Sequence, residues 1–178
     1  MTTIEKIQQL YSEVAENPIL LEKTITQPVV EGLTISQASF VVLYLQYQKH
    51  HFVVEGSEFY MLHNYFEESY EEVEKHAHDL GERLHGLGGV PALSLTKLSE
   101  LCCFEQESDD VYRCRLMVKH DLEAERSIIE VMRRQATQAE SFGDRATRYL
   151  YEQILLKTEE RAYHLEHFLT RDTLKVEW

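Results

Sequence analysis

Apolar residues recur every three to four positions over four long stretches of the chain, which predicts amphipathic helices. The stretches cover about residues 34–54, 57–87, 111–138 and 144–169. Ser57 is a suitable cap for the second helix, and Gly88 and Gly89 followed by Pro91 mark its end. The run Ser108-Asp109-Asp110 is a typical start for the third helix. Four helices of this length form a bundle.

The remaining segments are short. The long connection between the second and third helices carries a helical stretch at about residues 95–102. Near the N-terminus, helical spacing predicts a short helix before Pro18, and Pro28 indicates an extended segment at 25–30; the residues that carry the helical spacing are Ile4, Ile7, Tyr11 and Val14. We therefore predict an all-α fold with an N-terminal extension (1–31), a four-helix bundle (32–170) and a C-terminal tail (171–178).

Composition narrows the classes of function. The 178 residues suffice for one domain, and the formal net charge of −13 repels nucleic acid and anionic lipid. Cys102, Cys103 and Cys114 are odd in number and include an adjacent pair, which predicts reduced thiols rather than disulfides. There is no signal-peptide pattern and no run of about 18 apolar residues. We expect a cytoplasmic protein that does not enter membranes.

Histidines and carboxylates form one stripe along the second helix. At ~100° per residue, His63, Glu67, His78 and Glu82 fall at about 0°, 40°, 60° and 100° around the helix axis. Each i, i+4 pair can hold one ion. A single such pair is common by chance on an acidic helix, but two pairs on one narrow stripe favour a metal site over a solvated face.

The two pairs cannot reach one metal ion within a single helix. His63 and His78 are separated by roughly 22 Å along the axis at ~1.5 Å per residue. Two copies of the helix packed antiparallel across a twofold axis place the His63 and Glu67 end of one chain against the His78 and Glu82 end of the other. The stripe therefore predicts a metal site shared between subunits and occurring twice in each dimer.

Several motifs resemble the Dps family, the miniferritins named as DNA-binding proteins from starved cells. They are the run from His51 to His63, Phe66-Glu67-Glu68-Ser69-Tyr70, Gly81-Glu82-Arg83-Leu84 and Leu87-Gly88-Gly89-Val90-Pro91. The similarity covers about residues 33–169, and the segments 45–51 and 102–104 are most similar to the cyanobacterial branch. The resemblance implies a ferritin-like bundle assembled into a hollow dodecamer, a homo-oligomer of twelve chains.

The resemblance also implies a function and a ligand set. Members are ferroxidases that oxidise Fe(II) at a dinuclear site, with hydrogen peroxide preferred over dioxygen, and store the ferric mineral. They thereby contribute to iron homeostasis and to protection against oxidative stress. By position, His51, His63 and Glu67 come from one subunit, and His78 and Glu82 come from the other.

This sequence departs from the family pattern at four positions. Glu67 and His78 each replace a usual aspartate, and Phe52 stands where a tryptophan is usual. His164 lies near the position of another common tryptophan, where it is either an added metal ligand or a surface residue. The extra imidazole at residue 78 suggests that Zn(II) also binds at the site.

Two alternatives to an iron-storing ferroxidase remain at this point. One is a zinc-binding cage with weak ferroxidase activity, since imidazole favours Zn(II). The other is a nucleoid-binding protein, which usually needs a basic tail to neutralise phosphates. Residues 1–31 carry two lysines and five carboxylates, and the charges after Leu169 balance. Neither end suits DNA, so we expect weak or absent DNA binding at physiological salt.

Overall fold

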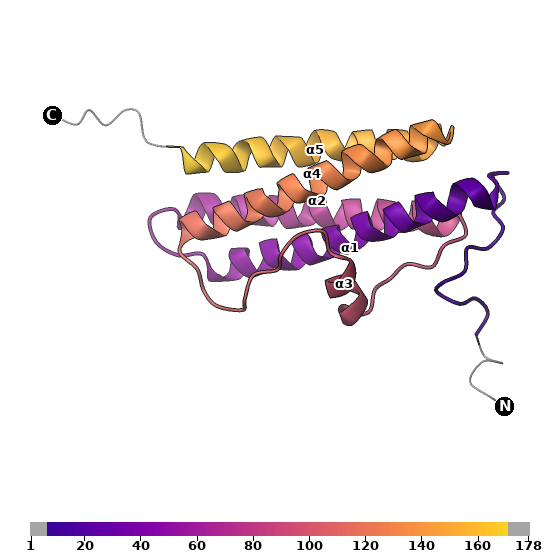
Figure 1. Cartoon of the computed structure of the whole chain (residues 1–178). Helices are drawn as coiled ribbons and strands as arrows, with labels where there is room; N and C mark the ends of the chain where they lie inside the picture. The colour runs from indigo at the N-terminus through magenta and orange to yellow at the C-terminus, as the bar shows by residue number, and fades with distance from the viewer. Residues whose placement is uncertain (1–6, 171–178) are drawn as a thin grey trace.

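The computed structural model describes residues 7–170, which form four long helices and one short one (Figure 1). The helices are α1 (Lys23–Val53), α2 (Phe59–Gly86), α3 (Leu95–Leu101), α4 (Cys114–Ser141) and α5 (Arg145–Leu169). This arrangement confirms the predicted all-α fold, with its short helix in the long connection between the second and third long helices.

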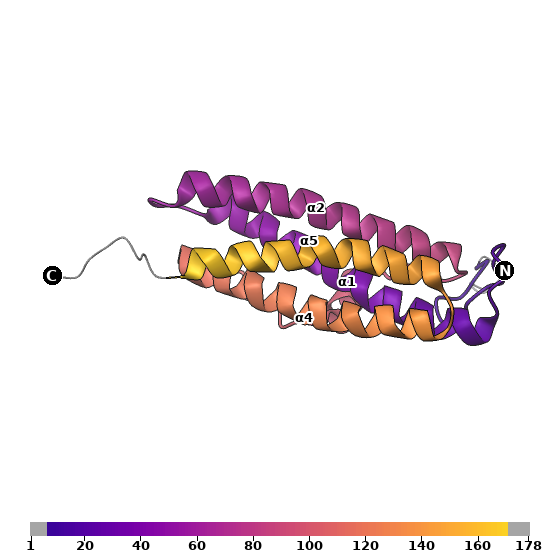
Figure 2. The same ribbon diagram turned by 90° about the horizontal axis from the view of Figure 1, so that it is seen from above.

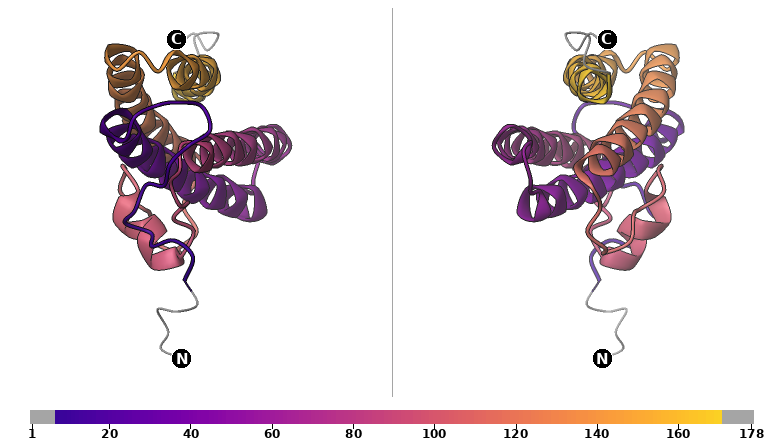
Figure 3. Two further views of the ribbon diagram at one scale, coloured as in Figure 1. Left: turned by 90° about the vertical axis from the view of Figure 1, so that its right-hand side faces the viewer. Right: turned by 90° about the vertical axis from the view of Figure 1, so that its left-hand side faces the viewer.

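The long helices pack as two antiparallel pairs. α1 lies along α2, and α4 lies along α5, as the view from above shows (Figure 2). End-on, one pair crosses the other, and the main contact between pairs is made by α1 and α4 (Figure 3). α3 packs on α1 at the side of the bundle. The core between the pairs contains fully buried large side chains such as Phe40, Tyr47, Phe66, Met132 and Tyr151.

The first helix differs most from the prediction. The segment 25–30, expected to be extended, is the beginning of α1, and Pro28 lies inside the helix. Proline at this position removes only one backbone hydrogen bond. Burial of Thr26, Val29 and Val30 offsets that loss. The division between extension and bundle at residue 32 stays a prediction, although residues 23–31 are helical.

Smaller corrections concern the helix ends. Residues 7–17 contain no helix, so the short helix before Pro18 is not observed; Ile4 lies outside the described residues. α2 begins after Glu58 without a cap from Ser57, and α4 begins after Arg113 rather than directly after Asp110. The ends of α2 and α5 agree with the prediction to within a residue, since the pattern placed them at 87 and 169.

α1 contains an 18-residue window with a mean hydropathy of 1.4, long and apolar enough to cross a membrane by composition alone. The window contains Ser36, Gln37 and Ser39, so it is not a continuous apolar run of the kind that the sequence lacks. Of that window, 67% is buried inside the bundle. Packing against α2, α3 and α4 accounts for the apolar character of α1.

Gly88 fixes the point at which the N-terminal segment meets the bundle. Its φ of +90° favours glycine, and an added Cβ would lie 2.2 Å from the carbonyl oxygen of Ala15. The Ala15 N–H donates to the Gly88 carbonyl oxygen over 2.8 Å. The Gly88 turn therefore allows residues before α1 to lie directly against the end of α2.

We expect Gly88→Ala to lower the free energy of unfolding by about 3 kcal/mol, because both the backbone conformation and the contact with Ala15 are lost. Gly86→Ala is the matched control, since an added Cβ there meets nothing within 4 Å. The control should remain within about 1 kcal/mol of the wild type. Denaturant unfolding of both variants measures the difference, and equal stabilities would contradict this account of the turn.

Candidate metal centre

His51 and His63 face each other across the connection between α1 and α2. His51 lies in the last turn of α1 and His63 near the start of α2. Their rings stack, with centroids 3.8 Å apart and planes inclined by 22°. The Nδ1 atom of each ring lies 3.0 Å from the main-chain carbonyl oxygen of the other residue.

These reciprocal contacts determine where the ring protons are. A carbonyl oxygen only accepts, so each Nδ1 must carry a hydrogen and donate it. Each neutral ring then keeps the lone pair on Nε2, and neither Nε2 atom has a hydrogen-bond partner within residues 7–170. Metal-binding histidines are commonly held in this way by a carbonyl group at the second nitrogen. The pair is therefore prepared to donate two lone pairs to a metal ion.

Aromatic side chains surround the two rings. Phe59 stacks on His63 with centroids 4.8 Å apart, and Tyr70 meets the His51 ring edge-on at 5.5 Å. Glu67 lies one turn beyond His63 and is half-buried. Burial and the nearby negative charge of Glu67 raise the pKa of Tyr70. Glu67 thus belongs to the same neighbourhood as the histidine pair.

The other predicted ligands lie apart from this pair. His78 and Glu82 are exposed on the later turns of α2. No group of three or more His, Cys, Asp or Glu side chains that could hold a metal ion occurs within residues 7–170 of one chain. Gly81, one residue before Glu82, is buried, and a Cβ added there would lie 2.3 Å from Gln37 Nε2 of α1. The five-residue site shared by two subunits stays a prediction.

His164 lies on α5 and is exposed. Its ring lies 6.4 Å from the Tyr65 ring and 5.9 Å from that of Tyr163, measured between centroids. A role for His164 as a sixth ligand also stays a prediction.

Inside the bundle, the buried guanidinium of Arg161 is the cation that pairs with the carboxylates. Arg161 of α5 donates through Nε and Nη2 to the two carboxylate oxygens of Glu125 at 2.6 and 3.2 Å, and through Nη1 to Glu72 at 2.5 Å. The Tyr47 hydroxyl donates to Glu125 over 2.8 Å. Burial lowers the pKa of Arg161, but the charge and hydrogen bonds of Glu125 outweigh it and raise the pKa, so the side chain remains a cation. A metal ion inside one subunit would have to displace this fixed charge.

Comparison with known proteins establishes the family. Residues 31–174 match the ferritin-like domain family. The chain is 64% identical over 176 residues to the nutrient stress-induced DNA-binding protein of Nostoc sp., which covers 99% of this chain and 96% of that protein. It superimposes on the crystal structure of an archaeal Dps homologue from Halobacterium salinarum with a TM-score of 0.93 and 34% identity, covering 99% and 98% of the two chains. The chain belongs to the Dps family of ferritin-like proteins.

This membership confirms the resemblance drawn from the motifs around His51 and His63. The chain is also 58% identical to the nutrient stress-induced DNA-binding protein of Synechococcus sp.. The alignment covers 94% of this chain and 96% of that protein. The cyanobacterial character of the sequence is therefore also confirmed. The fold of this Dps chain agrees with the predicted ferritin-like bundle.

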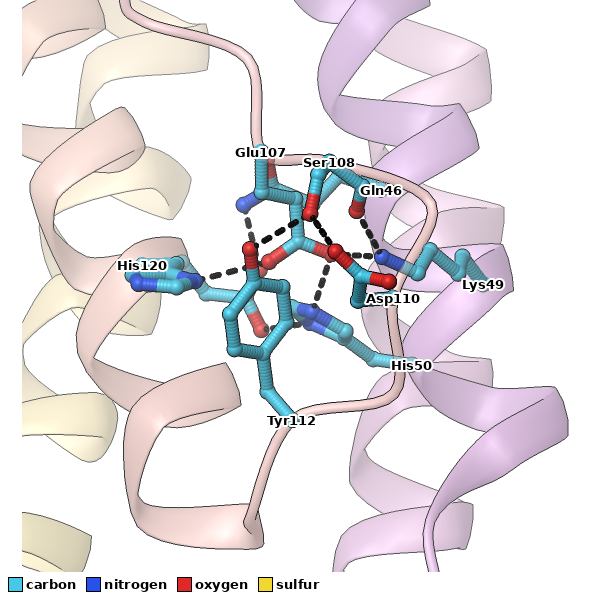
Figure 4. Close-up of polar contacts among 9 residues, drawn as sticks. Gln46, Lys49, His50, Glu107, Ser108, Asp110, Tyr112 and His120 are labelled. Carbon is cyan, nitrogen blue, oxygen red and sulfur yellow. Dashed lines mark hydrogen bonds and ion pairs between the residues drawn. The ribbon is translucent and has the colours of Figure 1, made fainter.

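Sequence reasoning missed a second buried network, centred on Glu107 in the connection that follows α3 (Figure 4). The Glu107 carboxylate lies 2.7 Å from Lys49 Nζ, 2.9 Å from His50 Nε2 and 2.7 Å from His120 Nδ1. The other ring nitrogen of His50 lies 2.9 Å from Asp121. The network therefore ties the connection to both α1 and α4 of this Dps subunit.

Two histidines outside the predicted ligand set, His50 and His76, are buried rather than solvated. His50 is 0% exposed and His76 is 6% exposed. Burial lowers the pKa of His50, but the charges and hydrogen bonds of Asp121 and Glu107 outweigh it and raise the pKa to about 9. Burial, with a smaller contribution from Arg161, lowers the pKa of His76 to about 3. At neutral pH, His50 is therefore protonated and His76 is neutral.

Glu107→Gln should destabilise the protein and change its response to acid. Burial raises the pKa of Glu107, but hydrogen bonds from His50, Lys49 and His120 outweigh it and lower the pKa from 4.5 to about 2. A depressed pKa contributes stability above about pH 4.5, and that stability is lost as the pH falls toward about 2. We expect a loss of about 2 kcal/mol at neutral pH that shrinks through this window.

The matched control is Glu105→Gln, since Glu105 is exposed in the same connection and forms no ion pair within the described residues. Unfolding curves recorded from neutral pH into the acid range measure both variants. A Glu107→Gln protein whose loss of stability is the same at every pH would contradict the assigned ion pairs.

Proposed function

We propose that this Dps protein oxidises Fe(II) at sites shared between twofold-related subunits and stores the ferric product inside a hollow dodecamer. The observation that carries the proposal is the His51 and His63 pair, in which both Nδ1 atoms donate to carbonyl oxygens and neither Nε2 atom has a partner among residues 7–170. Family membership supports the same assignment, since ferritin-like proteins include di-iron carboxylate proteins.

The chemistry of the donors fits iron as the substrate. His51, His63 and Glu67 are contributed by one subunit, and His78 and Glu82 by its partner. Imidazole and carboxylate together bind Fe(II), and the carboxylates stabilise the Fe(III) that forms. Two Fe(II) ions supply the two electrons that reduce one hydrogen peroxide to two waters, with uptake of two protons. The reaction removes both partners of radical-forming chemistry, which accounts for a protective role under oxidative stress in the cytoplasm.

The relatives from Nostoc and Synechococcus are called DNA-binding proteins. We do not propose DNA binding as the main function of this protein. The net charge of −13 opposes contact with phosphates, and residues 1–31 carry more carboxylates than lysines. The basic residues Arg126, Arg133 and Arg148 form ion pairs with glutamates at the surface, which leaves them partly neutralised.

Mixing two inactive variants tests whether the site is shared. His63→Ala and His78→Ala should each abolish most iron oxidation, because every site in either homodimer lacks one ligand. In a mixed dimer, one site lacks both ligands and the other is intact. Random pairing of co-expressed chains should therefore restore about a quarter of the wild-type rate. The rate is measured by absorbance after anaerobic Fe(II) loading and addition of peroxide.

Each variant must first be shown to assemble, which sedimentation measures. Twelve chains of 20.9 kDa give about 250 kDa. If both variants reach this mass and their mixture stays inactive, the five residues act within one chain and the shared site is excluded. A wild-type monomer that binds iron tightly would exclude it as well.

In the proposed site, inhibition of iron oxidation by Zn(II) depends on the imidazole of His78. Replacing a carboxylate by imidazole removes one negative charge and favours Zn(II), which cannot be oxidised. We expect Zn(II) to inhibit iron oxidation at low stoichiometry. His78→Asp should keep its activity and lose part of that inhibition. Calorimetric competition between Zn(II) and Fe(II), paired with oxidation rates, measures both effects.

The control for His78→Asp is His85→Asp, which makes the same change of charge on α2 outside the proposed ligand set. Only His78→Asp should reduce the affinity for zinc. Equal zinc inhibition in the wild type and His78→Asp would show that residue 78 does not contact the metal. A strong zinc affinity with negligible iron oxidation in all variants would instead favour the zinc-binding cage.

A further inference from the structure

A groove with a volume of about 630 Å³ lies at the end of the bundle where α1 joins α2 and α5 ends. Its apolar lining includes Met61, Leu62, Val111, Val118 and Phe168. Met61 and Val111 are large apolar side chains that remain exposed in the described part of the chain. An apolar surface of this kind, rimmed by polar residues, is typical of a binding site.

The rim of the groove carries charges of both signs. Glu55 and Glu58 lie on the side of the α1–α2 connection, and Arg113 and Arg115 lie on the side of α4. Neither arginine has a carboxylate within ion-pair distance among residues 7–170. The Arg115 guanidinium donates instead to the carbonyl oxygen of Leu169 over 2.6 Å. This bond holds the last turn of α5 against the rim.

The chain that follows α5 starts beside the groove. Phe168 lines it, and Thr170 is the last described residue. The next eight residues are Arg-Asp-Thr-Leu-Lys-Val-Glu-Trp. At ~3.3 Å per residue they can span about 26 Å, which is ample for a groove that adjoins their starting point.

The sequence of residues 171–178 is complementary to the groove. Leu174, Val176 and Trp178 alternate with polar residues, so in an extended segment they share one face. Among the intervening residues, Lys175 has the opposite charge to Glu55 and Glu58 on the rim. Glu177 has the opposite charge to Arg113 and Arg115. A tethered segment also has a high effective concentration at a neighbouring site.

We propose that residues 174–178 bind in this groove of their own chain, with Trp178 as the apolar anchor. The bound segment covers Val111 and Met61 and places Glu177 near Arg113. It also lies against the connection between α1 and α2, which joins His51 to His63. The proposal concerns binding of the segment alone and does not depend on iron oxidation.

Trp178 is the single tryptophan of the chain, so its fluorescence reports the proposal directly. In the full-length assembled protein, we expect emission at shorter wavelength than that of free N-acetyltryptophanamide and several-fold weaker quenching by acrylamide. Val111→Asp should move both properties toward those of the free compound, because it places a charge in the apolar lining of the groove. Emission and quenching equal to the free compound in the wild type would overturn the proposal.

Leu156→Asp is the matched control, since Leu156 and Val111 are both 64% exposed and Leu156 does not line the groove. The control should leave the emission unchanged. If Trp178 is shielded in the wild type and Val111→Asp leaves it shielded, another surface or a second copy covers it and the proposal fails.

Co-expression separates binding within one chain from exchange between chains. Val111→Asp chains are assembled together with Trp178→Ala chains, whose grooves are intact and lack their anchor. Binding within one chain leaves the single kind of tryptophan in the mixture exposed. Recovery of the shielded emission would show that the segment binds in the groove of a neighbouring chain, which overturns the assignment to its own chain.

Discussion

The ion cluster around Arg161 is the interaction on which the arrangement of the bundle depends. It joins α5 through Arg161, α4 through Glu125 and α2 through Glu72, and Tyr47 adds α1 by its hydrogen bond to Glu125. Arg161 and Glu125 are both buried. A buried charge that loses its partner costs about 3–5 kcal/mol. The four helices must therefore keep a relative position in which these groups meet, although α2 and α5 otherwise touch little.

This cluster also bears on where metal chemistry can take place. Related di-iron proteins bind metal inside the bundle, through inward-facing glutamates and histidines on facing helices. Here the inward-facing Glu125 already accepts hydrogen bonds from a guanidinium and a tyrosine hydroxyl. His76 lies beside Phe40, and its Nδ1 atom has no hydrogen-bond partner in the described part of the chain. Fixed positive charge in the interior opposes a divalent cation there. A site at the junction of α1 and α2, completed by a second subunit, avoids this opposition.

Most features that depend on residues close together in the sequence were predicted correctly, and features that depend on distant residues were not. The ends of α2, α3 and α5 depend on glycines, prolines and caps close in sequence, and the predicted bounds agree with the observed ones to within about two residues. The start of α1 depends on burial of Val29 and Val30 by distant residues, so local reasoning about Pro28 failed. The Glu107 and Arg161 networks join residues as much as 89 positions apart, and a helical stripe contains no signal for such pairings. Within the proposed site, periodicity indicated His63, Glu67, His78 and Glu82, whereas His51 came from the family resemblance alone.

The buried network around Glu107 explains the orientation of His51. Adjacent residues of a helix point about 100° apart, so any contact that fixes His50 also sets the direction of His51. His50 is held by Glu107 and Asp121, one on each ring nitrogen, and is fully enclosed. His51 is thereby turned away from α4 and toward the start of α2, where its Nδ1–H donates a hydrogen bond to the carbonyl oxygen of His63. The buried His50 thus orients His51, a ligand of the proposed metal site, and the connection after α3 contributes to that orientation through Glu107.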